Sequence, residues 1–305
     1  ISGFKNWEAV EREVHKAQKN GVTLLTLSDP GYPGVLKEIH DPPAVLYVRG
    51  AFHEDDACTV AVVGSRQPTE YGRMVAEKMA EGLARHGATI VSGMARGIDS
   101  IAHKACLRAG GRTIAVLGSG IDIVYPPEHK TLYEEIIENG AVVSEFPLGA
   151  APLAKNFPRR NRVISGISLG VLVVEATMRS GSLITARCAL DQGREVFAVP
   201  GNVLSPKSWG TNNLIKQGAK PVDKVEEILE EILPQIPGRA SLQGRAPSLS
   251  GEERRVYDFL EAEPQDINSI IQGCGIQSAQ ASAVLVGLEL AGLVKQLPGK
   301  RFARA

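Results

Sequence analysis

The 305-residue sequence has no excess of charge of either sign, because 34 lysines and arginines balance 34 aspartates and glutamates. No global field favours a polyanionic partner, so any nucleic-acid site has to be a local cationic patch. Cysteine is scarce, and its four positions form no C-x-x-C pair: Cys58, Cys106, Cys188 and Cys274. This spacing argues against a zinc site and a disulfide framework, and it fits a reducing, cytoplasmic location. No apolar run approaches the roughly 18–20 residues of a membrane span, so we expect no membrane partner.

Two nucleotide-binding motifs are also missing. The turn that starts at Gly64 has no G-x-G-x-x-G pattern, and Gly118-Ser-Gly120 lacks the third glycine. The phosphate-binding pattern G-x-x-x-x-G-K-S/T does not occur either. NAD and ATP binding therefore have no support in the sequence, and we predict neither a cofactor nor a resident metal.

What the sequence does contain is a regular alternation of short apolar runs and amphipathic helical segments. The runs cover residues 59–63, 89–91, 113–117, 141–143, 171–174 and 195–199. Strands that are apolar throughout and alternate with helices indicate a parallel sheet covered on both faces. The predicted fold class is thus α/β, with a doubly wound, mostly parallel sheet. Two short apolar segments, at 22–27 and within 41–50, are expected to pair with or cap this sheet.

Changes in composition divide the chain into four predicted parts. Residues 1–20 have helical spacing and are expected to be the remnant of, or the link from, an N-terminal helical module. Residues 21–233 form the α/β domain, and the Pro-, Gly- and Ser-rich residues 234–250 form a linker. Residues 251–305 contain three helical segments and a hairpin with a basic tip, which is typical of a winged-helix domain.

Glycine, serine and arginine recur where the predicted strands end. They are Gly64, Ser65 and Arg66 after the first strand, Gly93 and Arg96 after the second, and Ser180 and Ser182 after the fifth. Ligands of doubly wound sheets bind outside the carboxyl ends of the strands. Glycine lets backbone N–H groups approach an anion, and arginine offers a planar fork of donors. Tight turns explain any single loop equally well, but several such loops on one edge favour an anion site.

The densest cationic segment lies between the fourth and fifth predicted strands. Its candidate binding residues are Lys155, Phe157, Arg159, Arg160, Asn161 and Arg162. We expect a long loop here, followed by a helix over residues 163–168. Cations pair with phosphates and an aromatic ring stacks on unpaired bases, so the segment predicts a single-stranded nucleic acid as partner. The alternative is a solvated basic loop with Phe157 in the core, which the position beside Arg66 on the ligand edge disfavours.

Candidate catalytic groups are few. Asp99 and His103 share a helix face without a nucleophile beside them, and Asp99 is expected to brace a loop. Glu175, at the end of the fifth strand, is the best general base for an alternative function, a nucleotide or nucleoside-phosphate hydrolase. No second acid supports it, so we predict that the protein is not an enzyme. A third hypothesis is a DNA-binding regulator that acts through the winged helix alone.

Taken together, these motifs resemble the DNA-processing protein A (DprA/Smf) family. The resemblance is continuous over about residues 22–230 and rests on Asp41–Tyr47, Gly64–Arg66, Ser92–His103, Phe157–Gly166, Ser180–Ala186 and Val199–Gly201. It implies an extended Rossmann-like domain that binds single-stranded DNA without sequence preference. It also implies a homodimer that protects incoming DNA and loads the RecA recombinase during natural transformation.

The resemblance also assigns roles to individual residues. It implies that Arg66 is a phosphate clamp and that Lys155, Arg159 and Arg162 line the DNA pocket. In the winged helix, residues 278–291 contain no lysine or arginine, which argues against duplex reading by that helix. Lys300, Arg301 and Arg304 remain as phosphate contacts, unless this module binds protein.

Overall fold

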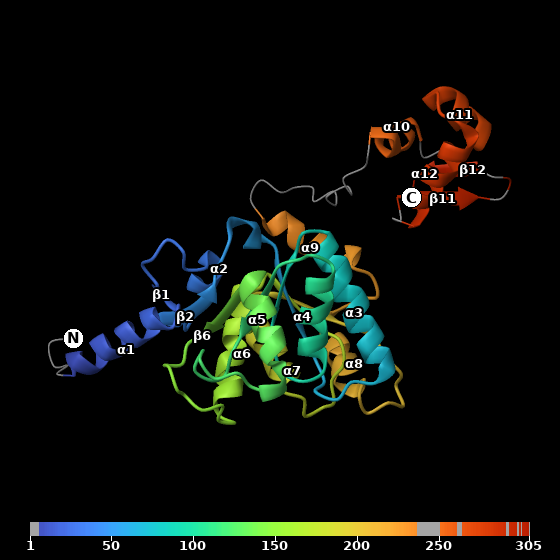
Figure 1. The fold of residues 1–305 in the computed structure, drawn as a ribbon. Helices are drawn as coiled ribbons and strands as arrows, with labels where there is room; N and C mark the ends of the chain where they lie inside the picture. Colours follow the sequence, from blue (N-terminus) through green and yellow to red (C-terminus); the bar gives the residue numbers. More distant parts are fainter. Residues whose placement is uncertain are drawn as a thin grey trace. The chain divides into compact units, whose positions relative to one another are not determined.

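The computed structural model describes residues 6–236, 251–260, 264–290, 293–297, 299 and 301–304. The chain forms two compact units, residues 1–244 and 245–305. The first is an α/β unit built on a large sheet, and the second is a winged helix (Figure 1). Both parts of the predicted fold class are confirmed. None of the described helices is long and apolar enough to span a membrane.

The sheet of the first unit has nine strands in the order β1-β2-β6-β5-β4-β3-β7-β8-β9. The strands are β1 (Thr23–Thr26), β2 (Val45–Gly50), β3 (Thr59–Val63), β4 (Thr89–Ser92), β5 (Thr113–Val116), β6 (Gly140–Ser144), β7 (Gly170–Val173), β8 (Glu195–Ala198) and β9 (Lys220–Pro221). From β6 to β9 all neighbours are parallel. From β3 the chain builds outward to β4, β5 and β6 on one side, and then returns to β7 on the other. This reversal is a topological switch point, where doubly wound sheets bind ligands.

Helices cover both faces of this sheet. On one face lie α3 (Glu70–Arg85), α4 (Ile98–Arg108), α5 (Lys130–Glu138) and α9 (Glu226–Ile232), and on the other α2 (Gly34–Lys37), α6 (Asn156–Ile167), α7 (Ser182–Asp191) and α8 (Trp209–Lys216). Strand β3 shows why both faces need cover: Val60 and Val62 pack with Met79 of α3, whereas Val63 packs with Ile164 of α6. Burying each such side chain contributes about 1.5–3 kcal/mol.

The two short segments before β3 extend the sheet, as predicted. Strand β1 pairs antiparallel with β2, and β2 pairs antiparallel with β6. Helix α1 (Trp7–Lys19) is joined to this edge through Glu13, whose carboxylate accepts hydrogen bonds from the Tyr47 hydroxyl (3.1 Å) and the Leu148 amide (2.8 Å).

The predicted loop over residues 155–162 is wrong, because helix α6 begins at Asn156 and includes most of the cationic segment. Pro158 caused the error. Proline is tolerated in the first turn of a helix, where the missing N–H would have no intrahelical partner. The basic residues are therefore distributed around a helix and do not line one extended track.

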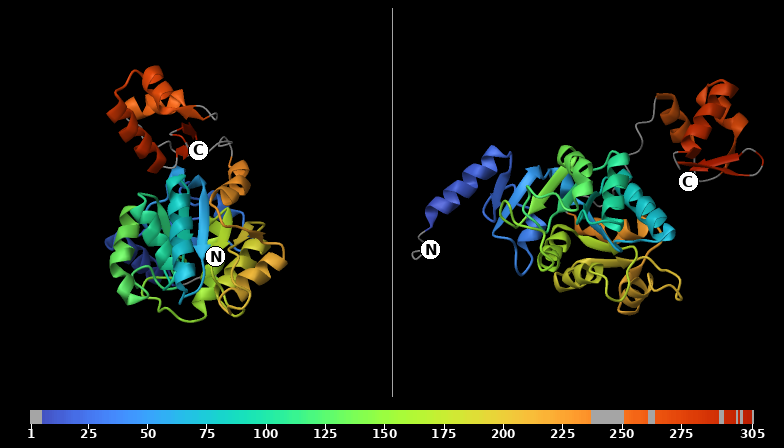
Figure 2. Two further views of the ribbon diagram at one scale, coloured as in Figure 1. Left: turned by 90° about the vertical axis from the view of Figure 1, so that its right-hand side faces the viewer. Right: turned by 60° about the horizontal axis from the view of Figure 1, so that its bottom comes forward.

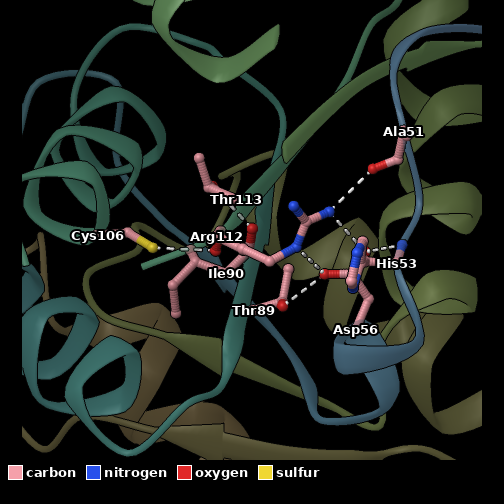
Figure 3. Close-up of polar contacts among 8 residues, drawn as sticks. All are labelled: Ala51, His53, Asp56, Thr89, Ile90, Cys106, Arg112 and Thr113. Atoms are coloured by element: carbon pink, nitrogen blue, oxygen red, sulfur yellow. Dashed lines mark hydrogen bonds and ion pairs between the residues drawn. The ribbon is translucent and has the colours of Figure 1, made fainter. Parts of the chain in front are cut away.

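At the amino ends of the strands, Arg112 ties neighbouring elements together (Figure 3). Its guanidinium donates to both carboxylate oxygens of Asp56 (2.9 and 3.0 Å) and to the carbonyl of Ala51 (2.9 Å). Asp56 lies in the 3₁₀ turn η1 (Glu54–Ala57) and also accepts from the Thr89 hydroxyl (2.7 Å) and the His53 amide (2.7 Å). This network fixes the chain between β2 and β3.

The second unit contains α10 (Gly251–Phe259), α11 (Ile267–Cys274) and α12 (Ser278–Leu290), with a small sheet in the order β10-β12-β11. Its strands are β10 (Gln265–Asp266), β11 (Val294–Leu297) and β12 (Arg301–Arg304). Arg304 donates to the backbone carbonyls of Tyr257 and Asp258, both at 3.1 Å, and stacks on the Tyr257 ring. Its guanidinium thus serves the fold of this unit. Lys300 and most of the predicted linker, residues 237–250, lie outside the described residues.

Candidate functional site

A cavity of about 830 Å³ lies at the carboxyl ends of the strands, at the switch point between β3 and β7. Its walls come from the loops that follow these strands and from the N-terminal parts of α6 and α7. The predicted site residues that line it are Gly64, Ser65, Arg66, Arg96, Phe157, Arg160, Asn161, Ser180 and Ser182. The structure therefore brings most of the predicted residues into one place.

The turn after β3 is fixed to the loop after β4. The Ser65 hydroxyl accepts a hydrogen bond from the Gln67 amide (3.2 Å), and the Ser65 carbonyl accepts one from the Ile98 amide at the start of α4 (3.1 Å). Gly97 permits this approach, since it has φ +82° and a Cβ there would overlap the Ser65 carbonyl oxygen. Both loops are therefore rigid parts of the cavity wall.

Arg66 and the cationic helix meet in the cavity. The Arg66 guanidinium carbon lies 5.4 Å from the centre of the Phe157 ring, and the Tyr125 ring lies 5.8 Å from the same ring. Arg66 is exposed, so its fork of N–H donors is accessible to an anion. The site combines a cation with aromatic faces, which are the two groups that a phosphate and a base need.

Arg160 also lies against the Phe157 ring, but it is buried, with 4 % of its surface exposed. Its guanidinium donates to the carbonyls of Gly93 (2.8 Å) and Val116, and its carbon lies 5.9 Å from the Phe157 ring. Burial lowers the pKa of Arg160 to about 10, which still leaves it protonated at neutral pH. A Cβ on Gly93 would lie 2.5 Å from this guanidinium, so the glycine makes room for the arginine.

Asp99 holds the same loop from the other side. Its carboxylate accepts hydrogen bonds from the amides of Gly93 (3.1 Å) and Ala95 (3.4 Å). Burial raises the pKa of Asp99, and the positive charge of Arg160 opposes this rise. The predicted bracing role of Asp99 is confirmed by these two bonds. Gly93 is the meeting point of both charged side chains.

Three predicted residues are not among those that line the cavity: Lys155, Arg159 and Arg162. A helix turns by about 100° per residue, so Phe157, Arg160 and Asn161 of α6 share the cavity face whereas Arg159 and Arg162 point away. Lys155 precedes α6 as its N-cap residue. The Glu145 carboxylate pairs with Arg159 (2.9 Å) and with Arg162. The structure does not bring these three cations to the cavity, and their role in nucleic-acid binding stays a prediction.

The remaining predicted residues have polar partners within the site. Arg96 borders the cavity and pairs with Glu128. The hydroxyls of Ser180 and Ser182 are 2.8 Å apart, and Ser182 begins α7, where the amides of Leu183 and Ile184 donate to the carbonyls of Ser180 and Gly181 (both 3.1 Å). The two hydroxyls and the partial positive charge of the helix end favour an anion.

Among the lining residues that the predicted set lacks, Lys207 and Tyr125 can contact a charged or flat ligand. Lys207 donates to the Gln67 carbonyl (2.6 Å) and to the Ser65 hydroxyl (3.3 Å), so its ammonium lies beside the turn of Arg66. It belongs to the loop after β8, which ends at the same edge, and this placement could have revealed it. Tyr125 follows β5 in a Tyr-Pro-Pro sequence and was visible in the same way.

The candidate base of the hydrolase hypothesis has a structural role. Glu175 is buried, and its two oxygens accept hydrogen bonds from the Thr69 amide (2.9 Å) and hydroxyl (2.7 Å). Thr69 is the N-cap of α3, so Glu175 anchors the start of that helix. It does not line the cavity. His103, the partner considered for Asp99, is fully buried and does not line the cavity either.

Comparison with known proteins places these features in a family context. Residues 23–233 match the model of DNA recombination-mediator protein A, and residues 241–300 match the DprA winged helix domain. Protein Smf of Escherichia coli is 45% identical over 283 residues, which cover 90% of this chain and 76% of that protein.

Two solved structures are similar to the chain. DNA processing protein A of Streptococcus pneumoniae has a TM-score of 0.67 and 42% identity, with 76% of this chain and 84% of that chain covered. DNA processing protein A of Helicobacter pylori has a TM-score of 0.62 and 31% identity, with 70% of this chain and 97% of that chain covered. The latter structure concerns a single-stranded DNA binding mode of that protein.

Proposed function

Because the chain belongs to the DNA recombination-mediator protein A family, we propose that it binds single-stranded DNA in the cavity at the switch point. In this proposal it protects incoming strands and loads the RecA recombinase onto them as a homodimer. The family resemblance supports the protection, the RecA contact and the dimer, whereas the DNA contact also rests on the geometry of the site.

The observation that carries the proposal is the contact of Arg66 with Phe157 inside the cavity. Arginine supplies charge and directed donors for a phosphate, and the aromatic ring supplies a flat partner for a base. Bases in a duplex are paired and stacked, so they cannot reach such a ring without being extruded. The arrangement therefore favours an unpaired strand and requires no base-specific contact.

The test measures binding of a fluorescently labelled oligothymidylate by anisotropy at several salt concentrations. Arg66→Ala is expected to lower the affinity about 10- to 100-fold, since a hydrogen-bonded charge contributes about 1.5–3 kcal/mol. The slope of the logarithm of the affinity against the logarithm of the salt concentration should become shallower by about one unit. Arg66→Lys keeps the charge and loses the planar fork, so it should lie between wild type and Arg66→Ala.

The matched control is Arg85→Ala, at the last turn of α3, which removes an exposed arginine paired with Glu81 on the same helix. It should bind like wild type. If Arg66→Ala also binds like wild type, or if duplex DNA binds more tightly than the single strand, the proposal is wrong. A regulator that uses only its winged helix would give the first of these results.

A further inference from the structure

The loop between β8 and α8 exposes apolar side chains although hydrogen bonds fix its shape. Val203 and Leu204 are 75% and 82% exposed, and the Trp209 side chain at the start of α8 is about half exposed. Single exposed apolar residues are common on protein surfaces, but a group of them on one ordered loop marks an interaction site.

Hydrogen bonds close this loop at its base. The side chain of Asn212 accepts from the Gly201 amide (3.2 Å) and donates to the Gly201 carbonyl (3.0 Å). Inside the loop, the Leu204 amide donates to the Asn202 side chain (2.8 Å). The indole N–H of Trp209 donates to the Val203 carbonyl (2.9 Å), which holds one edge of the ring. A ring held by its edge loses little conformational freedom when a flat partner covers its face.

The same loop forms part of the cavity wall. Lys207 lines the cavity, and its carbonyl accepts a hydrogen bond from the Ala176 amide (2.8 Å). The Gly210 amide, next to Trp209, donates back to the Ala176 carbonyl (2.8 Å). Thr177, which follows Ala176, also lines the cavity. Trp209 is thus tied by short bonds to residues that border the candidate DNA site.

A second aromatic ring is hydrogen-bonded to the start of the loop. Tyr71, in the first turn of α3, is half exposed, and its hydroxyl donates to the Pro200 carbonyl (2.9 Å). Figures 1 and 2 show α8 and the loop before it beside the N-terminal end of α3. The surface formed by Tyr71, Val203, Leu204 and Trp209 is called the loop surface below.

We propose that the loop surface is a stacking platform for unpaired bases of the strand whose phosphates lie in the cavity. The inference rests on the proposed function and extends it to residues outside the cavity. We assign the loop surface to the same strand because Lys207 belongs both to this loop and to the cavity wall. A strand held beside Ser65 and Lys207 leaves the cavity next to this loop. Tryptophan and tyrosine stack on every base, so the contact needs no particular sequence.

The test uses Trp209 as its own reporter. The chain has two tryptophans, Trp7 and Trp209, so Trp7→Phe leaves only the ring in question. An oligothymidylate is titrated into this variant while its labelled copy is followed by anisotropy. Quenching of Trp209 emission that saturates together with the anisotropy is the expected result. If the anisotropy rises and the emission does not change, the stacking inference is wrong and DNA binding stands. If neither signal changes, the proposed function itself fails.

A second measurement separates stacking from a disturbed loop. In the full chain, Trp209→Ala should weaken binding of the oligothymidylate about tenfold, whereas Trp209→Phe should retain most of the affinity. An oligonucleotide of abasic residues keeps the phosphates and lacks the bases, so Trp209→Ala should leave its affinity unchanged. Equal losses for both oligonucleotides would overturn the inference, since they would show that the substitution displaces Lys207. Wild-type affinity of Trp209→Ala for both would assign the loop surface to a different partner, such as a protein.

Discussion

The two ends of the large sheet each contain an arginine and an aspartate, and they use the pair differently. At the amino ends, Arg112 and Asp56 bond directly to each other through two short contacts (Figure 3). At the carboxyl ends, Arg160 and Asp99 both bond to the backbone of Gly93, one to its carbonyl and the other to its amide.

This difference assigns the amino end of the sheet to stability and the carboxyl end to binding. A carboxylate that already accepts from a guanidinium, a hydroxyl and an amide has little capacity left for a ligand, so the amino end is a closed structural network. At the carboxyl end the buried charges hold a loop in place, and the exposed Arg66 above them remains available. Fixed groups beneath an accessible one are the arrangement that a binding site requires.

The largest effect is expected from Asp56→Ala. This carboxylate is buried against Arg112, and removing one partner of a buried pair typically costs about 3 kcal/mol. Urea unfolding should show this loss, and Asp56→Asn should show a smaller one because it keeps an acceptor for Thr89. The folded variant should bind single-stranded DNA within about twofold of wild type. Weaker binding by the folded protein would mean that the amino end also contributes to the site.

The second effect concerns His103, which lies on α4 one turn after Asp99 and contacts β5 at its amino end. Its Nδ1 is 2.6 Å from the Thr113 hydroxyl, and that hydroxyl donates to the Ile90 carbonyl (2.8 Å). The hydroxyl therefore accepts from His103, so Nδ1 carries the proton of a neutral ring. Burial, together with smaller contributions from His129 and Arg160, lowers the pKa of His103 to about 3.

The sign of the pH effect follows from this lowered pKa. Below pH 6.5 the unfolded chain binds a proton at His103 that the folded chain does not, so the free energy of unfolding falls as the pH falls. The loss approaches about 1.4 kcal/mol per pH unit between pH 6.5 and about 3. At pH 4.5, wild type should have lost about 2.7 kcal/mol more than His103→Asn, relative to pH 7.5. Parallel curves for the two proteins would show that His103 is protonated in the fold.

The sequence predicted the strands well because parallel strands buried on both faces are apolar throughout, as in β3. Once the strands are located, the loops at their carboxyl ends are known as well, and ligands of doubly wound sheets bind at these loops. The sequence therefore also predicted where the cavity lies. The second half of helix α6 was expected, but its first two turns were missed because Pro158 suggested a loop. Without the helix, the separation of Phe157 and Arg160 from Arg159 and Arg162 could not be seen. That separation arises from the 100° turn per residue, which a linear motif does not display.

The third effect concerns Gly93, whose carbonyl is bonded to the buried Arg160 and whose amide is bonded to the buried Asp99. Gly93→Ala places a methyl group 2.5 Å from the Arg160 guanidinium, so the fork or the loop has to move. Affinity for single-stranded DNA should fall about tenfold, which corresponds to about 1.4 kcal/mol. Gly34→Ala is the matched control, because no atom lies within 4 Å of a Cβ at that position. If Gly93→Ala binds DNA like wild type, the bonds of Arg160 and Asp99 to Gly93 do not contribute to the site.

The smallest effect is expected on the outer face of α6. Arg159 is exposed and pairs with Glu145, and its guanidinium carbon lies 5.6 Å from the centre of the Phe146 ring, away from the cavity. Arg159→Ala should change the affinity for an oligothymidylate by less than about twofold and leave the salt dependence of binding unchanged, since Arg159 does not line the cavity. Arg66→Ala in the same assay provides the scale. A tenfold loss with Arg159→Ala would instead show that the strand crosses the outer face of α6. The cavity around Arg66 would then form only part of the DNA path.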